Sequence, residues 1–417
     1  MLTISENKKT LLKDEKPFFY LADTCWSAFT NITDDEWDYY LYKRKVQGFN
    51  TIQINILPQW DASATDLVYE PFVDKDPYQI NDAYFEHAKE MCKKAKAQGF
   101  ELALVVLWCN YVPGTWASNF MKDHILPFDC LDGYITKVDE TFSEFQPMYV
   151  ISGDTDFETD QTISYYVKAA ATLKKLAPKC LYTTHIKGRY TYIPENLNAY
   201  LDFLFYQSGH NAQDLSMPYS LSESMQQTYP DKPLINSEPC YEEMGYSRQM
   251  YGRWTRYDVR RAAYVSVLSG ACAGITYGAG GIYSWHKVNK SFAKFLGEGF
   301  DDPKSWEEAM AFPGAWDYGY LKALLENLNI QSLEARQDLL LNDTNDIRVA
   351  KADNGIYLVY IPCNTKVRLD LDCSSYTLQT IDLENRFVAN TAYEIKEGKT
   401  ILAIHPFHDD ALVVIKK

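Results

Sequence analysis

Residues 43–57 read KRKVQGFNTIQINIL, and residues 94–108 repeat the same arrangement as KAKAQGFELALVVLW. In each stretch a helical pattern ends at Gln-Gly-Phe and a run of strand-forming residues follows at once. A glycine just past a helix end accepts the left-handed backbone conformation, so Gly48 and Gly99 are expected to end their helices. The phenylalanine that follows re-enters the core as the next strand begins. Two such units in succession predict helices that alternate with the strands of a parallel sheet.

Eight strand candidates lie along the first three-quarters of the chain, and helical patterns separate them. The strands are PFFYLADT from Pro17, NTIQINIL from Asn50, ELALVVLW from Glu101, MYVISGDT from Met148, LYTTHIKG from Leu181, DFLFYQSGH from Asp202, PLINSEP from Pro233 and AGITYGAGGIYSW from Ala273. Thr33 and Glu36 form a capping-box pair that opens the first helix, and Asn81 or Asp82 can cap the second. Further helices are predicted over residues 131–145, 162–176, 220–229, 256–268 and 316–327. No glycine-rich dinucleotide turn follows the first strand, so the pattern predicts an α/β fold of the closed (β/α)₈ type, a TIM barrel.

The pattern of the sequence changes after Ile330, where the alternation of helices and strands ends. Short alternating segments separated by Asn, Asp and Gly turns follow, as in DIRVAKADNGIYLVYIP, KVRLDLD, YTLQTIDL and ALVVIKK. Alternation with period two predicts antiparallel strands that bury one face. We therefore expect a barrel over residues 1–330 and a small antiparallel β-sandwich over residues 331–417.

Composition and charge exclude several classes of protein. The formal net charge of −15 argues against nucleic acid or an anionic membrane surface as a partner, because either would be repelled. Nine cysteines, odd in number and without a CxxC pair, are typical of reduced thiols and not of disulfides or a zinc site. The N-terminal residues lack the apolar core of a signal peptide, and no segment approaches the ~20 apolar residues of a membrane span. From these features we expect a cytoplasmic protein.

The polar and aromatic residues that close the strand motifs are candidates for the active site, because a TIM barrel binds its substrate at the C-terminal ends of its strands. In chain order, the candidate substrate-binding residues are Asp23, Trp26, Gln53, Asn55, Trp108, Asn110, His185, Tyr206, Gln207, His210, Tyr241, Tyr277 and Trp285. Trp116 is a further candidate for a sugar-stacking wall. Each of these residues alone is more often a packing residue. Together they favour a neutral carbohydrate, since no cluster of Arg or Lys is present to bind a phosphate.

Two carboxylates, Asp154 and Glu238, follow the fourth and the seventh predicted strands. Strands at these positions face each other across the barrel mouth, which is the arrangement that a glycosidase needs. One carboxyl group must protonate the leaving oxygen, and the other must attack or stabilise the anomeric carbon. Gly153 is expected to let the backbone approach the substrate. The alternative is that either carboxylate is a helix cap or pairs with an arginine such as Arg260 or Arg261.

The acidic run GDTDFETD, residues 153–160, resembles the start of a calcium-binding loop. A calcium-binding loop needs a glycine at its sixth position and a bidentate Glu at its twelfth. Here these positions hold Thr159 and Tyr165, so the run does not match a calcium-binding loop. Asp156, Glu158 and Asp160 are therefore expected to be solvated loop residues or helix caps. We expect neither a metal ion nor an organic cofactor.

The motifs PFFYLADTCW, KRKVQGFNTIQINIL, ELALVVLW, ISGD, YQSGH, NSEPCYE, RRAAYVSVLSGACAGITYG and IYSW together resemble the family called domain of unknown function 4038, which includes glycoside hydrolase family 140. The similarity covers essentially the whole barrel. The segment after Ser332 resembles the small β-sandwich that often follows this barrel and carries a collagen-binding label. A sandwich packed on a barrel is more simply a structural appendage.

The resemblance implies a retaining β-glycosidase of the clan A type, in which Asp154 matches the acid/base and Glu238 the nucleophile. The characterised activity of the family is release of apiose from pectin side chains. This chain has Met148-Tyr149 and Ser152-Gly153 where the family usually has Trp and Gly-Gly, so Ser152 is expected to crowd the acid side and change the sugar preference.

We predict an exo-acting glycoside hydrolase for a small oligosaccharide or glycoside. The alternatives are a carbohydrate-binding pseudoenzyme on the same scaffold, and a barrel enzyme of another class, such as an isomerase or a metal-dependent hydrolase.

Overall fold

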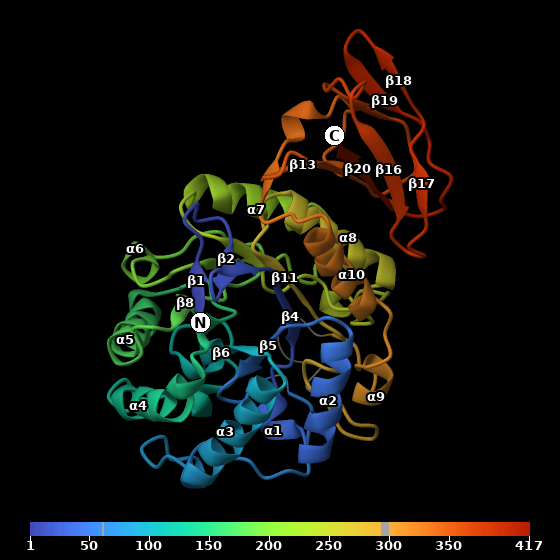
Figure 1. The fold of residues 1–417 in the computed structure, drawn as a ribbon. Coiled ribbons are helices and arrows are strands. Elements are labelled where there is room, and N and C mark those ends of the chain that lie inside the picture. The colour runs from blue at the N-terminus through green and yellow to red at the C-terminus, as the bar shows by residue number, and fades with distance from the viewer. Residues whose placement is uncertain (61, 293–299) are drawn as a thin grey trace.

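A barrel of eight parallel strands forms the centre of the computed structural model, which describes residues 1–60, 62–292 and 300–417 (Figure 1). Its strands are β4 (Tyr20–Thr24), β5 (Thr51–Asn55), β6 (Glu101–Trp108), β7 (Met148–Gly153), β8 (Leu181–Thr183), β9 (Leu204–Tyr206), β10 (Leu234–Asn236) and β11 (Gly274–Tyr277). They are hydrogen-bonded in the order β8-β7-β6-β5-β4-β11-β10-β9. Each lies within one of the eight predicted segments, so the predicted TIM barrel is confirmed.

Helices surround the barrel and connect successive strands. They are α1 (Ala28–Asn31), α2 (Asp34–Val46), α3 (Asp82–Ala97), α4 (Leu131–Phe142), α5 (Asp160–Leu176), α6 (Glu195–Asn198), α7 (Met217–Thr228), α8 (Arg256–Leu268), α9 (Trp306–Ala309) and α10 (Gly314–Asn327). Short 3₁₀ turns occupy residues 73–75, 109–111, 122–124, 143–145, 247–249 and 337–339. The capping box of Thr33 and Glu36 is present at the start of α2. Gly48 and Gly99 have φ values of 93° and 88°, so both helices end as the sequence predicts.

A small antiparallel sheet that the sequence did not reveal precedes the barrel. It consists of β1 (Leu2–Ile4), β2 (Leu11–Lys13) and β3 (Lys16–Phe18). Lys13 in β2 pairs with Glu101 at the start of β6, at a distance of 2.7 Å between Nζ and Oε1. The sheet therefore lies at the N-terminal ends of the barrel strands, opposite the face on which a TIM barrel carries its site.

The C-terminal strands form two antiparallel sheets, as the alternating pattern predicts. A six-stranded sheet has the order β12 (Leu333–Ala335), β13 (Arg348–Ala352), β14 (Tyr357–Ile361), β20 (Ala411–Lys416), β16 (Thr377–Asp382) and β17 (Val388–Asn390). A three-stranded sheet has the order β15 (Val367–Leu369), β19 (Lys399–Leu402) and β18 (Tyr393–Lys396). Figure 1 shows these sheets stacked against the helical layer of α7, α8 and α10.

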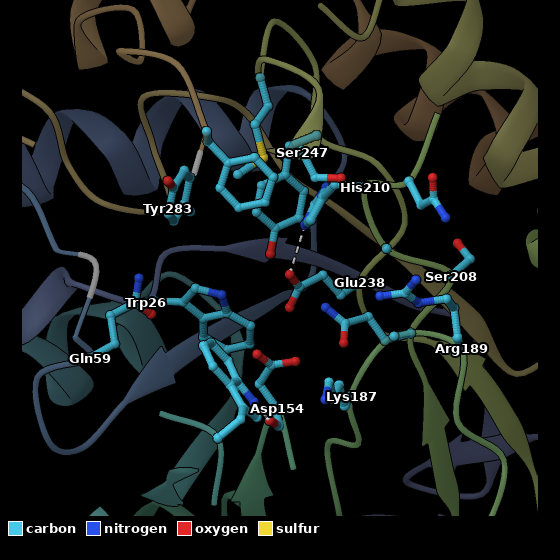
Figure 2. Close-up of a pocket in the computed structure, with 18 of the residues that line it drawn as sticks. Trp26, Gln59, Asp154, Lys187, Arg189, Ser208, His210, Glu238, Ser247 and Tyr283 are labelled. Carbon is cyan, nitrogen blue, oxygen red and sulfur yellow. Dashed lines mark hydrogen bonds and ion pairs between the residues drawn. The ribbon is translucent and has the colours of Figure 1, made fainter. Parts of the chain in front are cut away.

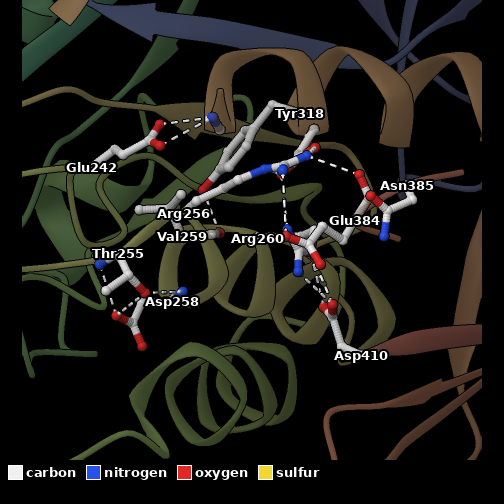
Figure 3. A network of polar contacts seen from close by, with 12 residues as sticks. Glu242, Thr255, Arg256, Asp258, Val259, Arg260, Tyr318, Glu384, Asn385 and Asp410 are labelled. Carbon is white, nitrogen blue, oxygen red and sulfur yellow. Dashed lines mark hydrogen bonds and ion pairs between the residues drawn. The ribbon is translucent and has the colours of Figure 1, made fainter. Parts of the chain in front are cut away.

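A buried ionic network joins the sandwich to the barrel (Figure 3). Arg260 in α8 lies 2.6 Å from Asp410, which precedes β20, and 3.1 Å from Asp317 in α10. Arg256 and Arg386 also pair with Asp317, at 2.7 Å and 3.0 Å. Apolar residues of the sandwich belong to the same hydrophobic cluster as the barrel core. The face of the six-stranded sheet toward the barrel therefore shares the barrel's hydrophobic cluster, and the residues between the two sandwich sheets form a second cluster.

No helix within the described ranges combines the length and the apolar character that a bilayer crossing requires.

Candidate active site

A cavity of about 360 Å³ opens at the C-terminal ends of the barrel strands (Figure 2). Its volume falls within the range of small-molecule sites. Eight of the candidates from the sequence line it, namely Trp26, Trp108, Trp116, Asp154, Gln207, His210, Glu238 and Tyr241. The barrel has thus brought the two predicted catalytic carboxylates into one pocket, although they lie 84 residues apart in the chain (238 minus 154).

Glu238 lies at the centre of this pocket, just after β10, and its side chain is buried. His210 donates from Nε2 to Oε1 of Glu238 at 2.9 Å, and Nε2 of His185 lies 3.0 Å from Oε2. Burial by itself would raise the pKa of Glu238, but the two imidazoles lower this pKa to about 2. Glu238 is therefore a carboxylate anion at neutral pH.

His185 lies beneath the pocket and connects the two carboxylate residues. Its Nδ1 accepts the backbone N–H of Asp154 at 3.1 Å, so the proton of the neutral ring must be on Nε2, the nitrogen that faces Glu238. The ring is fully buried, and Trp108 stacks on it with 5.6 Å between ring centroids. The N–H of Nε2 thus faces Oε2 of Glu238 at 3.0 Å and stabilises the charge of the carboxylate.

Asp154 follows β7 in a left-handed backbone conformation, with φ of 50°. Gly153 precedes it, and a Cβ there would lie 2.0 Å from Cε3 of Trp108. Gly153 is thus required by the Trp108 ring, and not by approach to a substrate as the sequence suggested. Ser152 is buried and donates to the carbonyl oxygen of His185 at 2.9 Å. It does not line the pocket, so the expectation that Ser152 crowds the acid side is wrong.

Several buried polar atoms of the pocket have no hydrogen-bond partner within the described ranges. They are Nε1 of Trp108, Oε1 of Gln207, Nδ1 of His210 and the hydroxyl of Tyr241. A buried polar atom without a partner costs free energy, so such atoms in a pocket indicate what the ligand supplies. Donors and acceptors gathered around one cavity suit a molecule with several hydroxyl groups.

Two predicted substrate-binding residues, on β4 and β5, are held by contacts within the protein instead. Asp23 is fully buried and accepts from Arg44 at 2.6 Å and Tyr40 at 2.8 Å. Gln53 donates to the backbone of Ser237 at 3.0 Å. Side chains within β4 and β5 that point into the barrel fill its core below the mouth. Gln53 is one of these side chains, whereas Asp23 points outward and attaches β4 to α2; neither reaches the cavity.

Other candidates form partnerships around the site. Asn55 donates to Gln59 at 3.0 Å, Asn110 lies 3.0 Å from His124, and Tyr206 donates to the carbonyl of Pro218 at 2.7 Å. Tyr277 donates to Glu242 at 2.6 Å, and Trp285 donates to Glu36 at 3.1 Å. The hydroxyls of Tyr206 and Tyr277, the indole N–H of Trp285 and the amide nitrogens of Asn55 and Asn110 thus have partners within the protein, and none of the five residues lines the cavity. The prediction that Asn55, Asn110, Tyr206, Tyr277 and Trp285 bind substrate directly is not supported by their positions.

The structure adds pocket residues that strand-end reasoning missed. Besides the predicted candidates, the lining consists of Gln59, Trp60, Asn119, Phe120, Lys187, Gly188, Arg189, Ser208, Gly209, Asn211, Met217, Met244, Ser247, Tyr283 and Phe300. Most of them lie in the long loops beyond the strand ends. The sequence signal that could have pointed to Lys187 and Arg189 was their position shortly after His185.

The acidic run after Gly153 is only partly solvated. Asp156 is nearly buried and pairs with Lys187 at 3.0 Å, which corrects the expectation for this residue. Glu158 is exposed but accepts the backbone N–H of Trp116 at 2.9 Å. Asp160 is exposed at the start of α5, whose cap is Thr159.

Neither Asp154 nor Glu238 pairs with the two arginines considered above, since Arg260 binds Asp317 and Asp410 and Arg261 binds Asp346. No group of three or more possible metal ligands occurs in the described ranges.

A family model described as the apiosidase-like catalytic domain matches residues 5–332. The chain belongs to this family. Among solved structures, this chain is similar to one titled glycoside hydrolase. The two share 22% sequence identity and a TM-score of 0.83, and the match covers 100% of this chain and 96% of that one. A glycoside hydrolase family 5 protein from Bacteroides vulgatus ATCC 8482 has 22% identity and a TM-score of 0.84, covering 100% of this chain and 93% of that one. No curated protein matches significantly. This apiosidase-like protein is therefore a glycoside hydrolase.

Proposed function

We propose that this apiosidase-like protein is an exo-acting glycosidase that works by double displacement with retention of the anomeric configuration. Glu238 attacks the anomeric carbon, and Asp154 protonates the departing oxygen and then activates water for the second step. The observation that carries this proposal is the state of Glu238. It is buried in the wall of the pocket, and two imidazoles hold it ionised with a pKa of about 2.

The link through His185 places the backbone of Asp154 one imidazole ring away from the carboxylate of Glu238, and a short separation of the two carboxyl groups is what retention requires. Retaining enzymes place their two carboxyl groups closer together than inverting enzymes, which leave room for a water molecule. Here a single imidazole spans from the backbone N–H of Asp154 to Oε2 of Glu238, with contacts of 3.1 Å and 3.0 Å at its two nitrogens. Figure 2 shows both carboxyl groups facing the same cavity.

The size and chemistry of the cavity support an exo-acting enzyme for a small glycoside. A volume of about 360 Å³ accommodates a short saccharide, and the tryptophan rings of Trp26 and Trp108 lie at 5.2 Å from each other on its wall. The unpartnered polar atoms around Glu238 fit the hydroxyl groups of a neutral sugar. Membership of the apiosidase-like family makes apiose the first sugar to test.

The experiment is a screen of 4-nitrophenyl glycosides, beginning with the β-apioside, followed by two isosteric variants on the accepted substrate. Glu238→Gln and Asp154→Asn should each lower kcat by about 10²-fold or more, because each removes a group that acts in the transition state. Glu243→Gln, on the same loop as Glu238 but outside the pocket, is the matched control and should retain turnover.

Two further measurements decide the mechanism. NMR of the first-formed product should show the anomer of the substrate, and a 2-deoxy-2-fluoro glycoside should label Glu238 covalently. An inverted first product would exclude double displacement. Normal turnover by Glu238→Gln would remove this residue from the mechanism, and binding without turnover by the unaltered protein would favour the pseudoenzyme.

A further inference from the structure

The backbone beyond β7 is held in an uncommon conformation in the loop of residues 154–158. Asp154 has φ of 50° and Phe157 has φ of 57°, both in the left-handed region. This region is unfavourable for a bulky residue such as phenylalanine. Such backbone conformations persist only where the surroundings hold them, and they are frequent at functional sites. The loop that carries Asp154 therefore needs contacts that keep it in place.

Glu158 supplies two of these contacts, one with each carboxylate oxygen. Oε1 accepts the backbone N–H of Trp116 at 2.9 Å, and Oε2 accepts the hydroxyl of Thr155 at 3.2 Å. The same Thr155 oxygen accepts the N–H of Phe157 at 3.1 Å. One side chain thus ties the loop both to itself and to the neighbouring wall of the pocket.

Trp116 holds the same loop through its side chain. Its indole N–H donates to the backbone carbonyl oxygen of Asp154 at 2.8 Å. The ring lines the cavity and packs edge-to-face on Trp60, with 5.4 Å between ring centroids. Trp116 therefore makes one hydrogen bond to Glu158 and one to Asp154, and its ring is held by a third contact.

We propose that Glu158 and Trp116 are positioning residues that hold the left-handed backbone at Asp154, so that its carboxyl group points into the pocket as the general acid. This inference rests on the proposed function of Asp154. Neither residue transfers a proton to the substrate in this proposal. Both act through the geometry of Asp154, because proton transfer depends on the placement of the acid within hydrogen-bond reach of the leaving oxygen.

The electrostatics of Glu158 support a positioning role. Although the residue as a whole is exposed, partial loss of hydration at its carboxylate and the neighbouring carboxylate of Asp156 raise the pKa of Glu158 to about 7. A glutamine would avoid this unfavourable charge, but an amide has a single acceptor oxygen. In a Glu158→Gln variant either Trp116 or Thr155 would lose its acceptor, whereas the shape of the side chain would be retained.

The experiment compares phenyl and 2,4-dinitrophenyl glycosides of the sugar that the protein accepts. In Glu158→Gln, and in Trp116→Phe, which removes the indole N–H but keeps a ring, kcat/KM for the phenyl glycoside should fall by about tenfold or more. For the dinitrophenyl glycoside the loss in Glu158→Gln should be less than about threefold, because a good leaving group departs without protonation. Trp116 also lines the cavity, so Trp116→Phe should lower both values, but the value for the phenyl glycoside more strongly. Asp160→Asn removes an exposed charge from the same stretch and should change neither value.

The outcomes separate this inference from the proposed function. Equal losses on the two substrates would indicate a general structural role for Glu158 and Trp116 and would overturn the inference, as would no loss on either. Asp154→Asn should show the same dependence on the leaving group, but more strongly. If it shows none, or if the unaltered protein hydrolyses no glycoside, the proposed function is overturned and this inference with it. Melting temperatures of all variants confirm that they fold.

Discussion

Two carboxyl groups four residues apart, Glu238 and Glu242, show how the surroundings of a residue determine its chemistry. Glu238 faces two imidazoles, which lower its pKa to about 2 despite burial. Glu242 is also buried, but its partners are neutral. It accepts the hydroxyl of Tyr277 at 2.6 Å and the N–H of Gly314 at 2.8 Å, and burial raises its pKa to about 7. Hydrogen bonds from neutral groups do not offset the loss of hydration of its charge.

The raised pKa of Glu242 predicts a specific dependence of stability on pH. Between its ordinary pKa of 4.5 and about 7, the native state binds this proton and the unfolded state does not. The free energy of unfolding should therefore fall as the pH rises through this range, by up to ~1.4 kcal/mol per pH unit from this group. Glu242→Gln should remove this group's contribution to the pH dependence of the free energy of unfolding. Urea unfolding at a series of pH values measures it, and the exposed Glu307→Gln should behave like the unaltered protein. Parallel pH profiles for Glu242→Gln and the unaltered protein would contradict the prediction.

The seam between β8 and β9 lacks a strand ladder, because these strands stand at the two ends of the hydrogen-bonded order. Asp202 bridges them. Its backbone N–H donates to the carbonyl of Tyr182 at 2.8 Å, and its carboxylate accepts the N–H of Tyr182 at 2.8 Å. Lys174 in α5 lies 2.7 Å from the same carboxylate. One side chain therefore takes the place of the missing ladder and attaches a helix to it.

Replacement of this bridge should destabilise the barrel. Asp202→Ala leaves the N–H of Tyr182 without its acceptor and should lower the free energy of unfolding by about 1–3 kcal/mol. Asp202→Asn keeps one acceptor oxygen and should cost less. Chemical denaturation measures both, with the exposed Asp231→Ala as control. A loss for Asp202→Ala no larger than that of the control would show that the seam does not depend on this residue.

Barrel and sandwich form a single body at the scale of the whole molecule. Asp410 accepts from Arg260 at 2.6 Å and from the hydroxyl of Tyr360 at 2.9 Å, and all three side chains are buried. Because a buried guanidinium needs its anionic partners, the sandwich cannot detach without exposing Arg260 of the barrel. The sandwich is thus a structural part of the enzyme, which accords with its interpretation as an appendage.

This coupling predicts cooperative unfolding. The unaltered protein should show one calorimetric transition. Asp410→Ala should lower the free energy of unfolding by about 3–5 kcal/mol, because it removes an anionic partner of the buried Arg260. Asp338→Ala, which breaks the exposed pair with Arg336, should cost less than about 1 kcal/mol. Two separate transitions in the unaltered protein, or an Asp410→Ala variant as stable as Asp338→Ala, would contradict the coupling.

Local sequence alone determined the elements of this protein. The glycines at Gly48 and Gly99, the capping box at Thr33 and the periodicity of the strands are interactions between near neighbours, so they predict helices, strands and the barrel without further information. The positions of Asp154 and Glu238 at strand ends followed from the same pattern. The N-terminal sheet was missed because its short strands are separated by charged turns and lack the longer apolar runs that mark the equally short barrel strands β8, β9 and β10.

Only the tertiary structure decided which strand-end residues reach the pocket. Asp23 and Trp26 are three residues apart, yet the first is fully buried against Arg44 and the second lines the cavity. The direction of a side chain at a strand end depends on the path of the loop that follows and on the partner that the neighbouring element presents. Lys187 and Glu158 likewise acquire their roles from contacts with Asp156 and Trp116 across the pocket wall. Such contacts form between distant segments, and no local periodicity encodes them.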